Sequence, residues 1–287
     1  MPDSRLNSDD VNIDGGRISA ADAEVLCESG GIDQLLLDLI PLAQERSLSS
    51  VSGFNVGAVG QGVSGDLYRG ANAEFELQPL NRTNHAEQAV VINAASHGEL
   101  GLRRLAVSAA PCGYCRQFLF ELTGAAELDI ILKDVPTRKL PHFLPDAFGP
   151  NDLGIEGGLL SPQDHKLEYT ESPSISEEQA ELLLEQANAS YAPYTKAYAS
   201  AGILISDGTF ITAPYLENAA FNPSASPMQA AVVRFGLSGY SPKDIVEASV
   251  LEVAGSPIAH ALAGSNLLKS IKPSAKVSSF TCQITSK

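Results

Sequence analysis

Three residues that can bind a metal ion lie in two short motifs, and these motifs constrain the fold of this chain more than any other feature. The first motif is His85-Ala86-Glu87, and 24 residues after its glutamate begins Pro111-Cys112-Gly113-Tyr114-Cys115. One imidazole and two thiols suit zinc, and three protein ligands leave a tetrahedral ion with an open position, as in catalytic zinc sites. The chain therefore has to fold so that both motifs face one ion.

Glu87 has two roles that the sequence leaves open. Asn84 is a good N-cap residue, so a helix over about 85–96 would place His85 in its first turn and Glu87 at position N3. A glutamate at N3 closes a capping box, which needs no catalysis. Beside a histidine and two cysteines, the same carboxylate is suited to moving protons to and from an activated water. We favour the catalytic role.

The second motif is also predicted to begin a helix, because proline is well tolerated in a first helical turn. With a start at Pro111, Cys112 and Cys115 would share one face, near a positive helix end that favours the thiolates zinc requires. Two thiolates cancel the charge of the ion, so a cation that hydrogen-bonds a sulfur would help to activate bound water. Arg116 is the candidate for this supporting role.

The two cysteines alone are also compatible with two other kinds of site. A strand followed by a Cys-x-x-Cys helix start is typical of thioredoxin-like redox proteins. The other alternative is a structural zinc site, in which Glu87 or a distant histidine is the fourth ligand. The redox alternative gives no role to His85 or Glu87.

Alternating strand and helix patterns in the first half predict a layered α/β domain. Strands are predicted at Phe54–Val59, Leu67–Phe75, Leu105–Ala109 and Leu128–Leu132. Before them, the apolar run Ile32–Ile40 predicts a helix that Pro41 should end or kink. We therefore expect a short helical segment at 1–46 and a catalytic domain at 47–150.

The second half of the chain is predicted to be a degenerate copy of the first. Glycine and proline in 151–175 predict a linker, and the capping box Ser176–Gln179 predicts the helix that opens a second domain at 176–287. The corresponding segments are Val56–Val59 with Ala201–Ile205, Asn72–Glu74 with Glu217-Asn218, and His85–Ala89 with Pro227–Ala231. The copy lacks the metal-binding histidine, the acid and the Cys-x-x-Cys. Chance similarity between two α/β segments is the alternative.

Composition limits the partners and the compartment. The chain has 34 acidic and 19 basic residues and a net charge of −15, which suits a neutral small molecule better than nucleic acid. No apolar run approaches the roughly 18 residues of a membrane helix, and Met1–Arg5 does not resemble the start of a secretory signal. Only four cysteines occur in 287 residues, so we expect no disulfide framework and a cytoplasmic location.

The motifs together carry a family resemblance. His-x-Glu with Pro-Cys-x-x-Cys is the signature of zinc-dependent nucleobase deaminases. From about residue 50 onward the chain resembles the cytidine deaminases, in their long homodimeric type with one active and one degenerate core per chain. The resembling segments are Phe54–Ala58, Gly70–Phe75, His85–Gln88, Pro111–Phe118, Leu144–Pro150 and Glu217–Pro223. The resemblance implies two duplicated three-layer α/β/α cores with mixed sheets, after a short helical N-terminal segment.

The resemblance also implies an activity. Cytidine or deoxycytidine would be hydrolysed to the uracil nucleoside and ammonia, in pyrimidine salvage, with one Zn²⁺ per chain activating the water that attacks C4. Glu87 would carry protons first to N3 and then to the departing amine.

Five residues resemble the family's substrate-binding groups. The backbone of Ala86 would read the base, Asn72 and Glu74 would bind ribose hydroxyls, and Phe54 and Phe148 would form the walls of the base pocket. The Glu74 carboxylate would disfavour a 3′-phosphate, which fits a free nucleoside. For Phe54, plain core packing is the alternative.

In this family the active site is completed across a homodimer, so Phe148 and the segment Ala220-Phe221 would serve the neighbouring subunit. Other substrates remain alternatives within the deaminases. A cytosine nucleotide would need a phosphate site, and cytosine in nucleic acid would need a basic groove with stacking aromatic residues. A zinc-bearing scaffold without activity is the alternative from another class.

Overall fold

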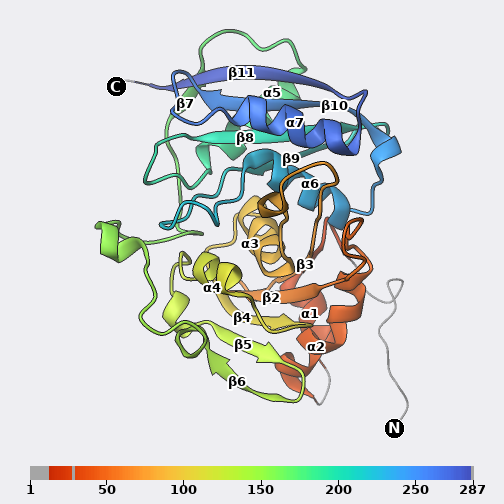
Figure 1. Cartoon of the computed structure of the whole chain (residues 1–287), viewed down its shortest axis with the longest axis vertical. Coiled ribbons are helices and arrows are strands. Elements are labelled where there is room, and N and C mark those ends of the chain that lie inside the picture. The colour runs from red at the N-terminus through yellow and green to blue at the C-terminus, as the bar shows by residue number, and fades with distance from the viewer. Residues whose placement is uncertain (1–12, 28–29, 286–287) are drawn as a thin grey trace.

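The computed structural model describes residues 13–27 and 30–285, and its strands form two mixed sheets (Figure 1). The first sheet has the strand order β1-β3-β2-β4-β5-β6. The bounds of these strands are β1 Arg17–Ile18, β2 Gly57–Gly62, β3 Leu67–Ala71, β4 Leu102–Val107, β5 Asp129–Leu132 and β6 Val135–Lys139. Strands β4 and β5 run parallel, and the other neighbours run antiparallel.

The second sheet repeats the topology of the first. Its order is β7-β11-β10-β8-β9, with bounds β7 Leu167–Tyr169, β8 Ala199–Ile205, β9 Phe210–Pro214, β10 Ile245–Val253 and β11 Lys276–Ile284. Strands β10 and β11 are parallel and the others antiparallel, so β9-β8-β10-β11 matches β3-β2-β4-β5. Even the register agrees, because Ala58 pairs with Val107 as Ala201 pairs with Val250. The predicted duplication is confirmed.

Helices cover both faces of each sheet. They are α1 Ala20–Leu26, α2 Gly31–Gln44, α3 Ala86–Ser96, α4 Gly113–Leu119, α5 Glu177–Asn188, α6 Pro227–Leu237 and α7 His260–Ile271. Among the described residues, none of these helices combines the length and the apolar character that spanning a bilayer requires. Because strand side chains alternate between faces, Val59 packs with α2 while Ala58 faces the core that contains α3.

The second sheet is covered in the same way, with α5 on its outer face and α6 and α7 on its inner face. Helices α3 and α6 lie against each other between the two sheets (Figure 1). One apolar core therefore joins the inner faces of both units, and the predicted pair of three-layer α/β/α cores is confirmed.

Two reciprocal hydrogen bonds join the halves at their centre. The amide of Gln88, on α3, donates to the carbonyl oxygen of Pro223 at 3.0 Å. Its counterpart Gln229, on α6, donates to the carbonyl oxygen of Arg82 at 2.6 Å. Each half thus holds a loop of the other through the same kind of contact.

The N-terminal segment is part of the first core. Strand β1 pairs with β3, and α2 covers the outer face of the sheet, so the boundary expected at residue 47 separates a helix from its sheet. The expected end or kink at Pro41 was wrong as an end, because α2 continues to Gln44. Burial of Leu42 and Ala43 stabilises the last turn and offsets the loss of the hydrogen bond that proline cannot donate. The expectation for 1–12 lies outside the described residues.

Other predicted boundaries also need correction. The expected linker 151–175 contains β7, which is hydrogen-bonded to β11 as an edge strand of the second sheet. The strand predicted from Phe54 begins only at Gly57, and the strand predicted to reach Phe75 ends at Ala71. Beyond Ala71, Asn72 joins the two segments: its N–H donates to the Val56 carbonyl, and its side chain accepts from the Val56 N–H and donates to the Phe54 carbonyl. The capping box at Ser176 is confirmed.

Candidate metal centre

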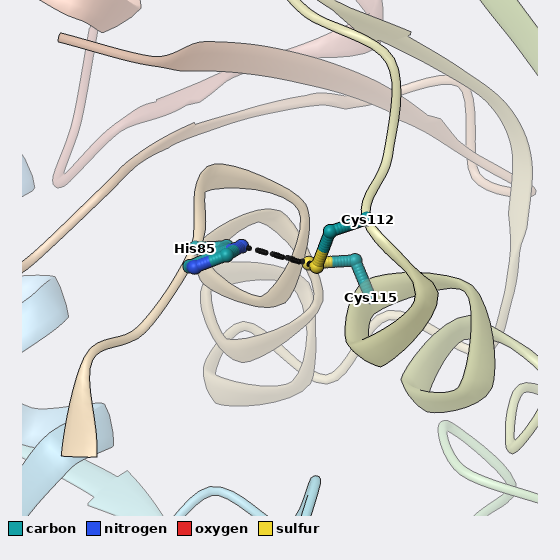
Figure 2. A group of neighbouring side chains, drawn as sticks. All are labelled: His85, Cys112 and Cys115. Carbon is teal, nitrogen blue, oxygen red and sulfur yellow. Dashed lines mark hydrogen bonds between the residues drawn. The ribbon is translucent and has the colours of Figure 1, made fainter. Parts of the chain in front are cut away.

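Three side chains from two helix starts meet at one point (Figure 2). His85 Nδ1 lies 3.5 Å from Cys112 Sγ and 3.3 Å from Cys115 Sγ, and the two sulfurs are 3.7 Å apart. Within residues 13–27 and 30–285, this is the one cluster of three or more His, Cys, Asp or Glu side chains arranged as metal ligands. The structure therefore brings together the three ligands predicted from the motifs.

These spacings fit a tetrahedral zinc ion. With zinc–sulfur distances of about 2.3 Å and zinc–nitrogen distances of about 2.0–2.1 Å, a tetrahedron has sulfur–sulfur edges of about 3.8 Å and sulfur–nitrogen edges of about 3.6 Å. The observed separations of 3.7, 3.5 and 3.3 Å are close to these edges. A dithiol redox site needs no imidazole beside both sulfurs, so the geometry favours the metal.

His85, rather than Asn84, caps helix α3. Its backbone is extended, with φ −86° and ψ 163°, and its N–H donates to Gln88 Oε1 at 3.1 Å. The expected cap at Asn84 was wrong, because its backbone pairs in both directions with Ala73 and stays in an extended bridge. Glu87 therefore occupies position N2. The capping-box contact that was expected from Glu87 at position N3 is made by Gln88 instead.

Glu87 is a buried carboxylate next to the ligands. Its side chain is only 3% exposed, and burial raises the pKa of Glu87, while its backbone and the charge of His85 act in the opposite direction. A carboxyl whose pKa is raised from its ordinary value is better suited to giving a proton back as well as taking one. Because Gln88 makes the capping contact, the position of Glu87 is not explained by helix capping.

Cys112 and Cys115 are set by helix α4. The helix begins at Gly113 and not at Pro111, with Cys112 as N-cap and Cys115 in the first turn. The neighbouring Cys115 thiol is the main group that lowers the pKa of Cys112, to about 4, and it is helped by N–H groups at the helix start. The hydrogen bond between the two sulfurs and burial raise the pKa of Cys115. Because zinc binds thiolates, binding of the ion would be coupled to loss of protons from this pair.

Arg116 has different partners from those expected. Its Nε donates to the carbonyl of Pro111 at 2.7 Å, and its Nη1 donates to the carbonyl of Phe143 at 2.8 Å. The expected hydrogen bond to a sulfur is wrong for the described structure, since the side chain runs back along the turn before α4. Arg116 instead fixes the backbone next to Cys112.

Asn72 and Glu74 lie beside the metal site, because the bridge between Ala73 and Asn84 joins the two segments. Glu74 holds the loop before β2. One of its carboxylate oxygens accepts from the N–H groups of Val51 and Ser52 at 3.0 and 2.8 Å, and the other accepts from the Ser52 hydroxyl at 2.5 Å. The Asn72 side chain is bonded to the Phe54 carbonyl and to the Val56 N–H, so both Asn72 and Glu74 shape the loop that carries this aromatic ring.

Ala86 and Phe148 occupy contrasting positions. Ala86 is fully buried in the first turn of α3, where Gly70 allows a close approach: a Cβ on Gly70 would lie 2.2 Å from the Ala86 carbonyl oxygen. Phe148 is 43% exposed, and its carbonyl accepts from the Gln117 amide, which places its backbone beside α4. Phe54 is 63% exposed, so plain core packing does not describe it.

The second half has the same scaffold without the ligands. Ser226 caps α6 as His85 caps α3, so Met228 and not Gln229 takes the place of Glu87. The expected alignment was one residue out at this point. Glu217 keeps the bonds of Glu74, since it accepts from the N–H groups and hydroxyl of the corresponding turn at Tyr194-Thr195. The residues lost in this half are those of the metal site.

Two contributors were missed in the sequence. Gln88 joins the His85 backbone to the other half of the chain, and the repeated glutamine at Gln229 was a signal that could have revealed it. Ser52 bonds both the Glu74 carboxylate and the Phe54 N–H. A lone serine in a polar loop gives no such signal.

Comparisons with known proteins agree with this geometry. Two models of the family described as cytidine and deoxycytidylate deaminase zinc-binding region match residues 32–128 and 140–264. A cytidine deaminase of Photorhabdus laumondii subsp. laumondii is 40% identical over 258 residues, which cover 88% of this chain and 86% of that protein. A cytidine deaminase of Photobacterium profundum is 40% identical over 240 residues, covering 84% and 80%.

Among solved structures, the cytidine deaminase of Mycobacterium tuberculosis is 35% identical, with a TM-score of 0.38; the match covers 40% of this chain and 96% of that one. The two family matches and the near full-length relatives agree with the duplicated fold and the clustered ligands. The chain belongs to the cytidine deaminase family, as a member of the long type that carries two such cores in one chain.

Proposed function

We propose that this protein deaminates cytidine and deoxycytidine hydrolytically, giving uridine or deoxyuridine and ammonia, in pyrimidine salvage. The observation that carries the proposal is the tetrahedral spacing of His85, Cys112 and Cys115 beside the buried Glu87. The relatives named above are cytidine deaminases, which supports the same activity here.

In this proposal His85, Cys112 and Cys115 hold one Zn²⁺ per chain. When bound, zinc would polarise a water molecule and supply a nucleophile at neutral pH. Glu87 accepts a proton from the attacking water and delivers it to N3 of the base. It then passes the second proton to the amino nitrogen, which leaves as ammonia while the C4 carbonyl forms.

Substrate binding is assigned to the residues around this centre. The backbone of Ala86 reads the base, and Phe54 and Phe148 enclose it. Asn72 and Glu74 bind the ribose hydroxyls, in addition to holding the Phe54 loop. Burial acts to raise the pKa of Glu74, but hydrogen bonds from Ser52 and Val51 outweigh it and the pKa lies below its usual value. The carboxylate is therefore charged at neutral pH and repels a phosphate on the sugar.

The substrate assignment is tested by assaying release of ammonia and the uracil product from cytidine, deoxycytidine and their 3′- and 5′-monophosphates. We expect turnover of both nucleosides, loss of turnover with a zinc chelator, and recovery with added zinc. The 3′-monophosphates should show at least about fivefold lower kcat/KM, since like charges about 4 Å apart repel by about 1 to 4 kcal/mol. Preferred turnover of a nucleotide, or of cytosine in single-stranded DNA, would contradict the assignment.

We also propose that the protein is a homodimer in a reducing compartment such as the cytoplasm, where both zinc-binding thiols stay reduced. The first core, with α2, would be catalytic, and the second would serve as scaffold. Phe54, Phe148 and Phe221 are 63%, 43% and 61% exposed, and a second subunit would cover them and complete the site.

The dimer is tested by sedimentation, which should give twice the chain mass of 30.2 kDa. Phe221→Asp should produce monomers with strongly reduced turnover, because a charge in an apolar interface is costly. Val25→Asp changes an equally apolar residue that is 84% exposed on α1, and it should leave mass and activity unchanged. A monomer with full activity would contradict the proposal.

A further inference from the structure

Glu121 is a fully buried carboxylate that has no place in the chemistry described so far. It follows α4 in the catalytic half, yet its donors come from the other half of the chain. Its Oε1 accepts from the hydroxyls of Tyr191 and Tyr194 at 2.8 and 2.5 Å, and its Oε2 accepts from the Ala219 N–H at 2.8 Å. Hydrogen bonds to a carboxylate are among the stronger ones, so this is a firm attachment between the halves.

The segment that Glu121 holds, residues 217–223, is here called the bridging loop. It contacts both helices that carry the metal ligands. The amide of Asn218 donates to the carbonyl of Gln117, two residues after Cys115, at 3.2 Å. The carbonyl of Pro223 accepts from Gln88, whose other amide atom receives the His85 N–H.

The bridging loop therefore connects the start of α3 with α4 through the degenerate half. His85 is carried by one of these helices, and both cysteines are carried by the other. Their spacing of 3.3 to 3.5 Å depends on how the two helix starts are held. A ligand set held to within a few tenths of an ångström needs support of this kind.

We propose that Glu121 is a positioning residue: by anchoring the bridging loop it fixes the two ligand-bearing helices and slows the loss of zinc. The inference rests on the proposed zinc site, but it concerns metal retention and can be tested without substrate.

The test compares Glu121→Leu, which removes the acceptor, with Glu121→Gln. A glutamine can turn its oxygen to the Ala219 N–H and its amide to the two tyrosine hydroxyls, so it should rescue the contact. Zinc release to a chromogenic chelator is followed at 25 °C, together with kcat and KM. We expect Glu121→Leu to release zinc at least about tenfold faster and to lose a similar factor in kcat, with Glu121→Gln within about threefold of wild type.

Leu183→Ala is the matched control, because it empties a fully buried position on the outer face of the second sheet, away from the bridging loop. It should lower the melting temperature without changing zinc release or kcat. If Glu121→Leu behaves like this control, Glu121 is only structural and the proposal is overturned.

A second variant covers the case in which Glu121→Leu does not fold. The double variant Tyr191→Phe/Tyr194→Phe removes two hydrogen-bond donors to Glu121 with almost no change in volume. It should speed zinc release at least about threefold, and an unchanged rate would overturn the proposal. A wild-type protein that holds zinc but deaminates nothing would refute the proposed function and leave this comparison intact.

Discussion

Glu87→Gln is expected to fold and to bind zinc as the wild type does, but to lose at least about a thousandfold in kcat, within the range that a positioned acid–base group contributes. The amide has nearly the same shape as the carboxylate, and it cannot accept and return the proton that deamination requires. The side chain is only 3% exposed, so solvent water cannot easily replace it. Turnover is measured by ammonia release, and zinc content by elemental analysis of the same sample.

The structure sharpens this experiment because it separates Glu87 from helix capping. Gln88 makes the N3 contact with the His85 backbone, so loss of a cap cannot explain a defect at position 87. Glu99→Gln is the matched control: Glu99 is also buried in the catalytic half, at 5% exposure, where it is bonded to Ser64 and Tyr68. It should keep nearly normal turnover. Activity of Glu87→Gln close to that of Glu99→Gln would rule out the catalytic role.

The metal site could be predicted from sequence because its chemistry is concentrated in two short motifs. His85, Cys112 and Cys115 have ligand atoms that few structural roles require at this spacing, and each motif begins a helix as expected. What failed was local detail that tertiary contacts decide. The N-cap is His85 and not the predicted Asn84, because Asn84 pairs with Ala73. Nothing in the sequence near Asn84 indicates this pairing.

The duplication could be predicted in outline, but the residue-by-residue alignment of the two copies could not. Counting from the shared glutamates, His85 lies 11 residues after Glu74, whereas Ser226 lies nine residues after Glu217. The loop of the second copy is thus two residues shorter, and only the backbone shows where the helix starts.

The partners of Arg116 could not be predicted either. A long cationic side chain can reach several acceptors, and the turn before α4 offers carbonyl oxygens as well as sulfurs.

Comparison of the two copies separates the structural role of Glu74 from any role in the site. Glu74 and Glu217 keep the same bonds to the preceding loop, although only the first half has metal ligands. Holding that loop is therefore a property of the fold and needs no substrate. Any contribution of Glu74 to ribose binding is additional to this structural role.

Cys115→Ser is expected to abolish stable zinc binding, leaving less than about a tenth of the wild-type content after dialysis against a mild chelator, and to abolish turnover with it. The thiolate is the zinc ligand, and a serine hydroxyl does not ionise near neutral pH, so one of three protein ligands is lost. Serine is close to cysteine in size, and Cys115 is fully buried, so the fold should survive.

Cys282→Ser tests whether loss of a buried thiol alone has this effect, because Cys282 is equally buried but lies in the core between α5 and the second sheet. It should keep its zinc and its activity.

Thiol labelling gives a second measure in the wild type. Cys112 is exposed, and its pKa near 4 makes it a thiolate at neutral pH, so an alkylating reagent should modify it first once the metal is removed. Zinc should slow the modification of Cys112, because coordination withdraws electron density from the sulfur and makes it a weaker nucleophile. Equal labelling with and without zinc, or full zinc content in Cys115→Ser, would mean that the ion is held by some other set of side chains.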